Sequence, residues 1–409
     1  MIDPKLRNVS RRDWLGIVGR FGLTSTLYAA AGMTGLVTTA GLAQAADATE
    51  KKRKKVTPKF TLKMGAAGFN EKNLNIEHAA FLFFARDLED RTDGAIRVNF
   101  IGDNAICNQL DCVKKTQQGI VDIFAASTQN SAGSAPYYNV LDYAYMFPSR
   151  ASQFHFFYHP KSNVLFREPL RKLHNIEFLF THCELRGIQL GLKWKDKPTV
   201  KAVSDLAGTK NRVTGTQLGR IAMQLLDLNP VPIAWEETLD GLKNGLIDGA
   251  ETWATAVAYA GMTPVISQSI DLRFFCGTEH CAMNHATFQK LGSALQEQVM
   301  ESAYTAQINT QGFNEAGIVN VVGQTNPPRP GTLFDKYKVR VVEMPDAEIK
   351  KAEQKCSPQF NPKPWEQWRE RINKWSGGHD TYKEIFDIAR EIPVTTVAEN
   401  VEPRRWWKA

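Results

Sequence analysis

Hydrophobic and polar residues alternate over residues 60–64 and 96–101, which predicts two β-strands. Between them, apolar residues recur at helical spacing over residues 75–93, which predicts an amphipathic helix that ends at Gly94. A further helix and strand are predicted over residues 109–118 and 120–125. Strands that alternate with helices in this way form a parallel sheet with helices on its faces, so the sequence predicts an α/β fold.

A second α/β segment follows near Cys183. Its predicted elements are a strand over 211–213, a helix over 217–228, an extended stretch over 230–233 and a helix over 235–244. Residues 287–322 contain no proline and predict one long helix, broken at Gly312 or Gly317. The C-terminal third predicts amphipathic helices, with Trp365, Trp368 and Trp375 packed in a core or at an interface.

Length and composition narrow the class of protein. The chain has 409 residues, enough for two or three domains. Hydrophobic residues make up 43% and charged residues 23%, which excludes a disordered or collagen-like chain. Six cysteines are too few for a disulfide-based scaffold.

The net charge of +7 is concentrated at the N-terminus. Residues 1–55 contain ten Lys and Arg against four Asp and Glu, so the rest of the chain is close to neutral. A neutral body lacks the basic surface that nucleic-acid binding requires, and we expect no nucleic-acid partner.

The N-terminus has the pattern of an export signal. Arg11 and Arg12 form a twin-arginine pair, a long stretch without charge follows Arg20, and a small-residue site ends at Ala45. This pattern predicts export to the periplasm with cleavage after Ala45. The alternative is a retained membrane anchor. The basic linker that follows, residues 46–57, is expected to be solvated rather than bound to a membrane surface.

Motifs for enzymatic chemistry are missing from the sequence: it has no P-loop, nucleophile elbow or H-E-x-x-H. Cys107 and Cys112 are five residues apart, as are Cys276 and Cys281, and outside the cytoplasm either pair could form a disulfide. Zinc bound by Cys276, His280 and Cys281 is a weaker alternative.

An arginine at the end of a predicted strand is the stronger functional candidate, although an arginine there could also be a surface residue. Arg212 lies in a predicted strand that ends at Gly215, where a guanidinium can hold a carboxylate by two parallel hydrogen bonds. Residues 205–215, DLAGTKNRVTG, resemble the D-L-x-G-x-K-x-R signature of the substrate-binding subunits of tripartite ATP-independent periplasmic (TRAP) transporters. Residues 229–249, 89–101 and 118–122 resemble further blocks of that family in the same order.

The resemblance implies a two-lobed periplasmic binding-protein clamshell that closes on one small organic acid, with Arg212 on the carboxylate. It implies a long connecting helix and a C-terminal helical extension that packs on lobe II or a dimer partner. The expected divisions are a signal peptide at 1–45, a linker at 46–57, lobe I at 58–184 and 279–320, lobe II at 185–278, and the extension at 321–409. Hinges are expected at 183–187 and 273–281.

A narrower resemblance is to the 2-oxo- and 2-hydroxy-acid subgroup, carried by residues 187–191, GIQLG, and 248–253, DGAETW. It implies that Gln189 and Glu251 coordinate a Na⁺ or Ca²⁺ ion that bridges to the ligand. Two alternatives remain, in which Glu251 pairs with Arg212 without a metal and Gln189 is a surface residue. Trp253 or Thr252 would line the pocket. The sequence departs from the subgroup because Thr252 separates Glu251 from Trp253.

Other contacts are less defined. Arg186 is a candidate second carboxylate contact or a surface residue, and Phe69, Asn70 and Asn130 are candidates in the N-terminal lobe.

The resulting expectation is a receptor, not an enzyme, that delivers its acid to a TRAP membrane permease and needs no cofactor beyond that cation. A homodimer with contacts through Trp365 and Trp368 is expected as one possibility. Two alternatives remain: an exported enzyme with a redox cofactor, and a receptor that only signals to a membrane kinase.

Overall fold

A computed structural model describes residues 55–70 and 78–408. The predicted signal peptide and most of the basic linker lie outside these residues, as does the start of the helix predicted over 75–93. Within the described ranges, no helix has both the length and the apolar character needed to cross a membrane. The chain forms two compact units.

Unit 1 is built on a five-stranded sheet and comprises described residues up to Ala126 together with 175–182 and 279–316. In order across the sheet, its strands are β2 (Ile96–Ile101), β1 (Phe60–Ala66), β3 (Ile123–Ser127), β10 (Glu279–Asn284) and β4 (Ile176–Thr181). Strands β2 and β3 run parallel to β1, whereas β4 and β10 pair antiparallel. Its helices are α4 (Ala79–Arg91), α5 (Cys112–Gln117), α12 (His285–Lys290) and α13 (Ser293–Gly317).

The local sequence explains why these elements begin and end where they do. On β1, Leu62 and Met64 are buried while Thr61 and Lys63 are exposed, as the alternation predicts. The chain leaves α4 through Gly94, whose φ of +80° suits glycine. The predicted strands at 60–64 and 96–101 are confirmed.

Unit 2 contains the second sheet and comprises residues 127–174, 183–278 and 317 onward. Its strand order is β11 (Arg340–Glu343), β9 (Ile266–Phe275), β5 (Arg186–Gly191), β8 (Gly249–Thr252), β6 (Lys210–Val213) and β7 (Asn229–Pro232). Its first helices are α6 (Thr128–Ser131), α7 (Arg150–Tyr158), α8 (Glu168–His174), α9 (Gln217–Leu225), α10 (Thr238–Lys243) and α11 (Ala254–Tyr259). The last four are α14 (Leu333–Lys336), α15 (Asp346–Cys356), α16 (Glu366–Trp375) and α17 (Thr381–Ile388).

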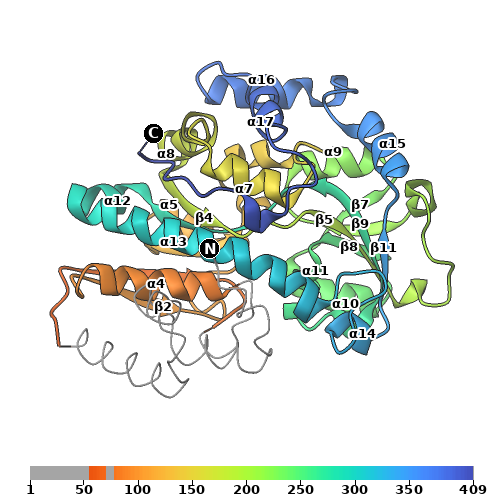
Figure 1. Ribbon diagram of the computed structural model, residues 1–409, viewed down its shortest axis with the longest axis horizontal. Helices are drawn as coiled ribbons and strands as arrows, with labels where there is room; N and C mark the ends of the chain where they lie inside the picture. Colours follow the sequence, from red (N-terminus) through yellow and green to blue (C-terminus); the bar gives the residue numbers. More distant parts are fainter. Residues whose placement is uncertain (1–54, 71–77, 409) are drawn as a thin grey trace. The chain divides into compact units, whose positions relative to one another are not determined.

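The C-terminal extension is part of unit 2. Phe334, Val339 and Val341 share one hydrophobic cluster with residues of α10 and α11. Trp365 is fully buried, and its ring lies 5.8 Å from that of Tyr143. In Figure 1, α16 and α17 lie above α7 within this unit. The extension therefore packs on unit 2, and Trp365 is buried in that packing.

Two expectations differ from the observed structure. Residues 127–174, expected in lobe I, belong to unit 2. The helix expected over 287–322 is split at Gly292, whose φ of +77° ends α12 before α13 begins. Two of the points where the chain passes between units, 182/183 and 278/279, fall beside or within the expected hinge segments.

Candidate functional site

Three neighbouring strands of unit 2 carry the predicted ligand-binding residues. Strand β5 begins at Arg186 and contains Gln189, β8 contains Glu251, and β6 contains Arg212. Strand β8 lies between the other two. All four side chains are at most 1% exposed. Burying a charged group without a partner is costly, so the partners of these groups show what each one does.

Arg186 and Glu251 form a buried ion pair. Arg186 Nε donates a short hydrogen bond to Glu251 Oε1, and Nη2 donates to Oε2 at 3.0 Å and to the Glu251 backbone oxygen at 3.1 Å. Arg186 Nη1 donates to the Gly277 oxygen at 3.4 Å. The two-pronged contact pairs Nε and Nη2 with the two carboxylate oxygens, and the bond from Nη1 to Gly277 satisfies the third guanidinium nitrogen. Arg186 is a buried partner of Glu251, so its interpretation as a surface residue is wrong, whereas its role as a second carboxylate contact stays a prediction.

Trp253 supports this ion pair. Its ring lies 4.3 Å from the Arg186 guanidinium carbon, and its Nε1 donates to the Glu184 oxygen at 3.1 Å. The Glu184 carboxylate accepts from the Ala254 nitrogen at 3.0 Å and from the Thr255 hydroxyl at the start of α11. The indole is only 3% exposed, so it packs against the Arg186 guanidinium inside the unit.

Arg212 has no such carboxylate partner. Its Nε donates to the Ile233 oxygen at 3.2 Å, and its guanidinium carbon lies 5.1 Å from the Trp235 ring. No carboxylate in the described part of the chain forms an ion pair with it. Burial, with a smaller contribution from the charge of Arg186, lowers the pKa of Arg212 to about 10, so it is still protonated at neutral pH. The site thus contains a buried cation whose charge is not balanced by an ion pair.

The strand register separates Gln189 from Glu251. Gln189 lies opposite Ala250 and Ile188 lies opposite Glu251. Because successive side chains point to opposite faces of a sheet, Gln189 and Glu251 lie on opposite faces. The predicted cation site needs both side chains as ligands, and this register does not bring them together. Gln189 instead shares its face with Arg212, which also lies beside Ala250.

Two more polar residues belong to the face of Gln189 and Arg212. Thr252 pairs with Gly187, which places it on this face, and Ser269 pairs with Gln189 from β9. Gln189 Oε1 and Ser269 Oγ are buried without a hydrogen-bond partner among the described residues. Ser269 was missed in the sequence, although the alternation in β9 puts polar residues on one face.

A buried carboxyl close to the Arg186–Glu251 pair was also missed. Gln129 Nε2 donates to Asp142 Oδ1 at 3.1 Å, and the Thr214 hydroxyl donates to Gln129 Oε1 at 3.0 Å. Burial raises the pKa of Asp142 to about 7, and the charges of Arg186 and Glu251 act on it in opposite directions. No sequence motif linked residues so far apart.

The candidates of the N-terminal lobe are divided between the units. Phe69 and Asn70 belong to unit 1, whereas Asn130 belongs to unit 2. The Phe69 ring stacks on His78 at 3.8 Å, and Asn70 bonds to Asp103. Phe69 is buried in the core of its unit, which argues for packing rather than ligand contact.

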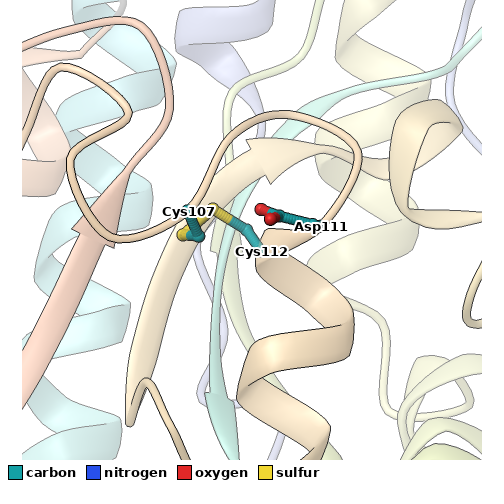
Figure 2. A group of neighbouring side chains, drawn as sticks. All are labelled: Cys107, Asp111 and Cys112. Carbon is teal, nitrogen blue, oxygen red and sulfur yellow. A yellow bond between two sulfur atoms is a disulfide. The ribbon is translucent and has the colours of Figure 1, made fainter.

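Of the two cysteine pairs, only one forms a disulfide. Cys107 and Cys112 are bonded, with a Cα–Cα distance of 4.8 Å, and Figure 2 shows the bond beside Asp111. Cys276 and Cys281 are free and buried. In the described ranges, the group in Figure 2 is the only one that brings three potential metal-ligating side chains together, and its sulfurs are bonded to each other. The zinc alternative at Cys276 and Cys281 therefore finds no support.

Comparison with known proteins identifies relatives of this arrangement. The family model described as bacterial extracellular solute-binding protein, family 7 (DctP) matches residues 67–317. The 2,3-diketo-L-gulonate-binding periplasmic protein YiaO of Escherichia coli is 22% identical over 253 residues, which cover 58% of this chain and 71% of YiaO.

Solved structures show the same fold. A TRAP periplasmic solute-binding protein from Roseobacter denitrificans with bound β-D-glucuronate has a TM-score of 0.66 at 17% identity, covering 81% of this chain and 100% of that chain. A TRAP periplasmic solute-binding protein from Haemophilus influenzae with bound L-gulonate has a TM-score of 0.66 at 15% identity, covering 80% and 99%. The predicted α/β binding-protein fold is confirmed.

Proposed function

Because this chain belongs to the bacterial extracellular solute-binding protein family 7, we propose that it captures a small 2-hydroxy or 2-oxo acid in the periplasm for a TRAP membrane permease. Members of this family are receptors, so the alternative of an exported redox enzyme is set aside. The observation that carries the proposal is the buried guanidinium of Arg212, which lacks a carboxylate partner in the described chain.

A ligand carboxylate would offset the free-energy cost of burying the charge of Arg212. A guanidinium presents planar, parallel donors that match a carboxylate, and charged hydrogen bonds are stronger away from water. Among the described residues, the Ile233 oxygen is the acceptor found for Arg212, 3.2 Å from Nε. The two terminal nitrogens remain for the ligand.

The residues beside Arg212 favour an acid with an oxygen on the carbon next to the carboxylate. Gln189 shares the face of Arg212, and its buried amide oxygen lacks a donor among the described residues. A 2-hydroxyl supplies such a donor. Among the ligands of the relatives above, L-gulonate carries a hydroxyl at that carbon, whereas β-D-glucuronate carries a ring oxygen and 2,3-diketo-L-gulonate a keto oxygen, both of which only accept. The amide oxygen of Gln189 therefore favours a 2-hydroxy acid over a 2-oxo acid.

Two aromatic rings suggest what the rest of the ligand is like. Trp235 is half-buried beside Arg212, and its ring lies 6.2 Å from that of Tyr259. Aromatic rings at a binding site pack against the CH-rich face of a sugar or other ring. A sugar acid therefore fits this surface better than a two- or three-carbon acid.

Binding measurements on the mature chain test this proposal. Isothermal titration with D-glucuronate, L-gulonate, lactate and pyruvate, each with and without Na⁺ and Ca²⁺, measures affinity and any cation requirement. Propionate and D-glucose are matched controls that lack the 2-oxygen or the carboxylate. We expect binding only of the oxygenated acids, at least 100-fold weakened in Arg212→Gln. Unchanged affinity in that variant would refute the proposal.

The sequence predictions on export, cation and assembly need their own measurements. Export through the twin-arginine route with cleavage after Ala45 predicts a secreted chain that begins at Ala46 by N-terminal sequencing. A bound Na⁺ or Ca²⁺ ion, for which the sequence indicates Gln189 and Glu251 as ligands, predicts cation-dependent affinity in the titrations above. Light scattering reports whether the chain forms the expected homodimer.

A further inference from the structure

A short basic loop joins β5 to the segment that leads into β6. Residues 192–201, here termed the lysine loop, contain Lys193, Lys195, Lys197 and Lys201 against a single acidic residue, Asp196. All five of these side chains are exposed. In Figure 1 the loop follows β5 and passes beside β11. The loop has no role in the carboxylate site described above.

Arg340, the first residue of β11, fixes the backbone of the lysine loop. Its Nη2 donates to the oxygens of Trp194 at 2.7 Å and Lys195 at 3.0 Å. Its Nη1 donates to the Lys197 oxygen at 2.9 Å and to the Thr199 hydroxyl at 3.0 Å. One side chain thus holds four points of the loop.

Gln268 on β9 adds three more bonds to the same loop. Its Nε2 donates to the oxygens of Trp194 at 3.4 Å and Pro198 at 3.2 Å, and its Oε1 accepts from the Val200 nitrogen at 3.0 Å. Loops ordinarily carry few such restraints. Strand β11 lies beyond residue 317, where the match to the family ends, so this fixation involves a part of the chain that the family model does not cover.

Apolar side chains lie next to the lysines. Leu192 is 45% exposed and Leu246 is 60% exposed. Lys193 connects the two segments, since its Nζ donates to the Gly245 oxygen at 2.7 Å and lies 3.4 Å from Asp248. The surface therefore combines two exposed leucines with four lysines on a loop whose backbone is held in place, beside the carboxylates of Asp196 and Asp248.

We propose that the lysine loop with Leu246 docks on an acidic, partly apolar face of a protein, the periplasmic side of the permease that this receptor serves. The proposal rests on the function proposed above. Charge complementarity sets the sign of the partner's surface. The seven hydrogen bonds favour a protein over a lipid surface, because a fixed backbone improves recognition of one shape, whereas attraction to anionic lipids needs only the charges.

Membrane vesicles that carry the permease subunits, with their periplasmic face outward, test the proposal. We expect the full mature chain to bind them, and a charge-reversed variant, Lys195→Glu with Lys197→Glu, to bind at least tenfold more weakly at low salt. Arg340→Gln keeps every lysine but releases the loop, and we expect a three- to tenfold loss. The matched control, Lys350→Glu with Lys374→Glu, reverses two exposed charges elsewhere on unit 2 and should bind as the wild type does.

Several outcomes would overturn the proposal. Equal binding to protein-free vesicles of the same lipids, or to protease-treated vesicles, would assign the loop to lipid. An equal loss of binding in the control variant would show a general charge effect. No loss in the charge-reversed variant would show that the lysine loop takes no part in docking. Titrating each variant with D-glucuronate or L-gulonate separates the docking proposal from the proposed function. Docking can fail while ligand binding persists, and ligand binding can fail while docking persists.

Discussion

Unit 2 contains two buried arginines on neighbouring parts of one sheet, and their surroundings differ in one respect. Arg186 gives all its nitrogens to protein acceptors, above all to the carboxylate of Glu251. Arg212 gives one nitrogen to a backbone oxygen and has no carboxylate partner in the described chain. The difference shows that burial alone does not mark a binding residue. The charge balance around the guanidinium is what distinguishes Arg212, the proposed ligand contact, from Arg186.

The largest expected effect comes from breaking the balanced pair. Glu251→Gln leaves the Arg186 charge buried without compensation, and we expect a loss of about 3–5 kcal/mol in the free energy of unfolding. Urea denaturation of the unliganded protein measures it. Glu353→Gln removes a partly exposed partner of Arg390 and should cost less than about 1 kcal/mol. Equal losses in both variants would contradict the contrast.

Ligand linkage should separate the two arginines in the next experiment. A bound acid at a hundredfold excess over Kd should stabilise the wild type by about 2.7 kcal/mol. Glu251→Gln should gain a similar amount, because Arg212 is intact. Arg212→Gln should gain nothing, although its unliganded stability stays close to that of the wild type. Thermal unfolding with and without D-glucuronate or L-gulonate measures these gains, and a gain in Arg212→Gln would contradict the assignment.

The sequence predicted these two arginines unequally well, for physical reasons. Arg212 was found because a strand followed by a glycine, within a family-like signature, defines its place locally. The partner of Arg186 depends on the pairing of β5 with β8, which are far apart in the chain. The same register puts Gln189 and Glu251 on opposite faces. A one-residue change in register would reverse that, and alternation within a single strand does not reveal it.

The fold, like the site, could be predicted from the sequence only where local signals define it. The strands at 60–64 and 96–101 could be located from alternation, since each is bounded by local signals. The membership of residues 127–174 in unit 2 follows from long-range contacts that no local pattern records. Asp142 and Gln129 lie in that segment, which is why the sequence offered no signal for their hydrogen bond beside the ion pair.

Asp142 provides a titration that is sensitive to the Arg186–Glu251 pair. Its folded pKa, about 7, lies above the unfolded value of about 3.9. Its contribution to stability is therefore greatest at low pH and is lost as pH rises from about 4 to 7. Asp142→Asn keeps an acceptor for Gln129, so we expect it to raise the free energy of unfolding by about 1–3 kcal/mol at pH 8 and to change it little at pH 4.

Denaturation of this variant across pH checks the sign. The Glu251→Gln variant sharpens the test, because removing the carboxylate leaves the attraction of Arg186 and should lower the apparent pKa of Asp142. A stabilisation by Asp142→Asn that is equal at pH 4 and pH 8 would show that ionisation of Asp142 plays no part.

The smallest expected effect concerns the ring beside the unbalanced arginine. Trp235→Leu removes an aromatic face 5.1 Å from the Arg212 guanidinium carbon, and a partly exposed contact of this kind contributes about 1 kcal/mol. We expect Kd for the acid to rise roughly fivefold, measured by titration. Trp368→Leu is the matched control, because Trp368 faces Arg371 at 5.2 Å on α16, outside the proposed site. If both substitutions weaken binding equally, the ring beside Arg212 has no special part in recognition. A loss confined to Trp235→Leu would mean that the ring of Trp235 and the guanidinium of Arg212, which has no carboxylate partner in the described chain, bind the acid together.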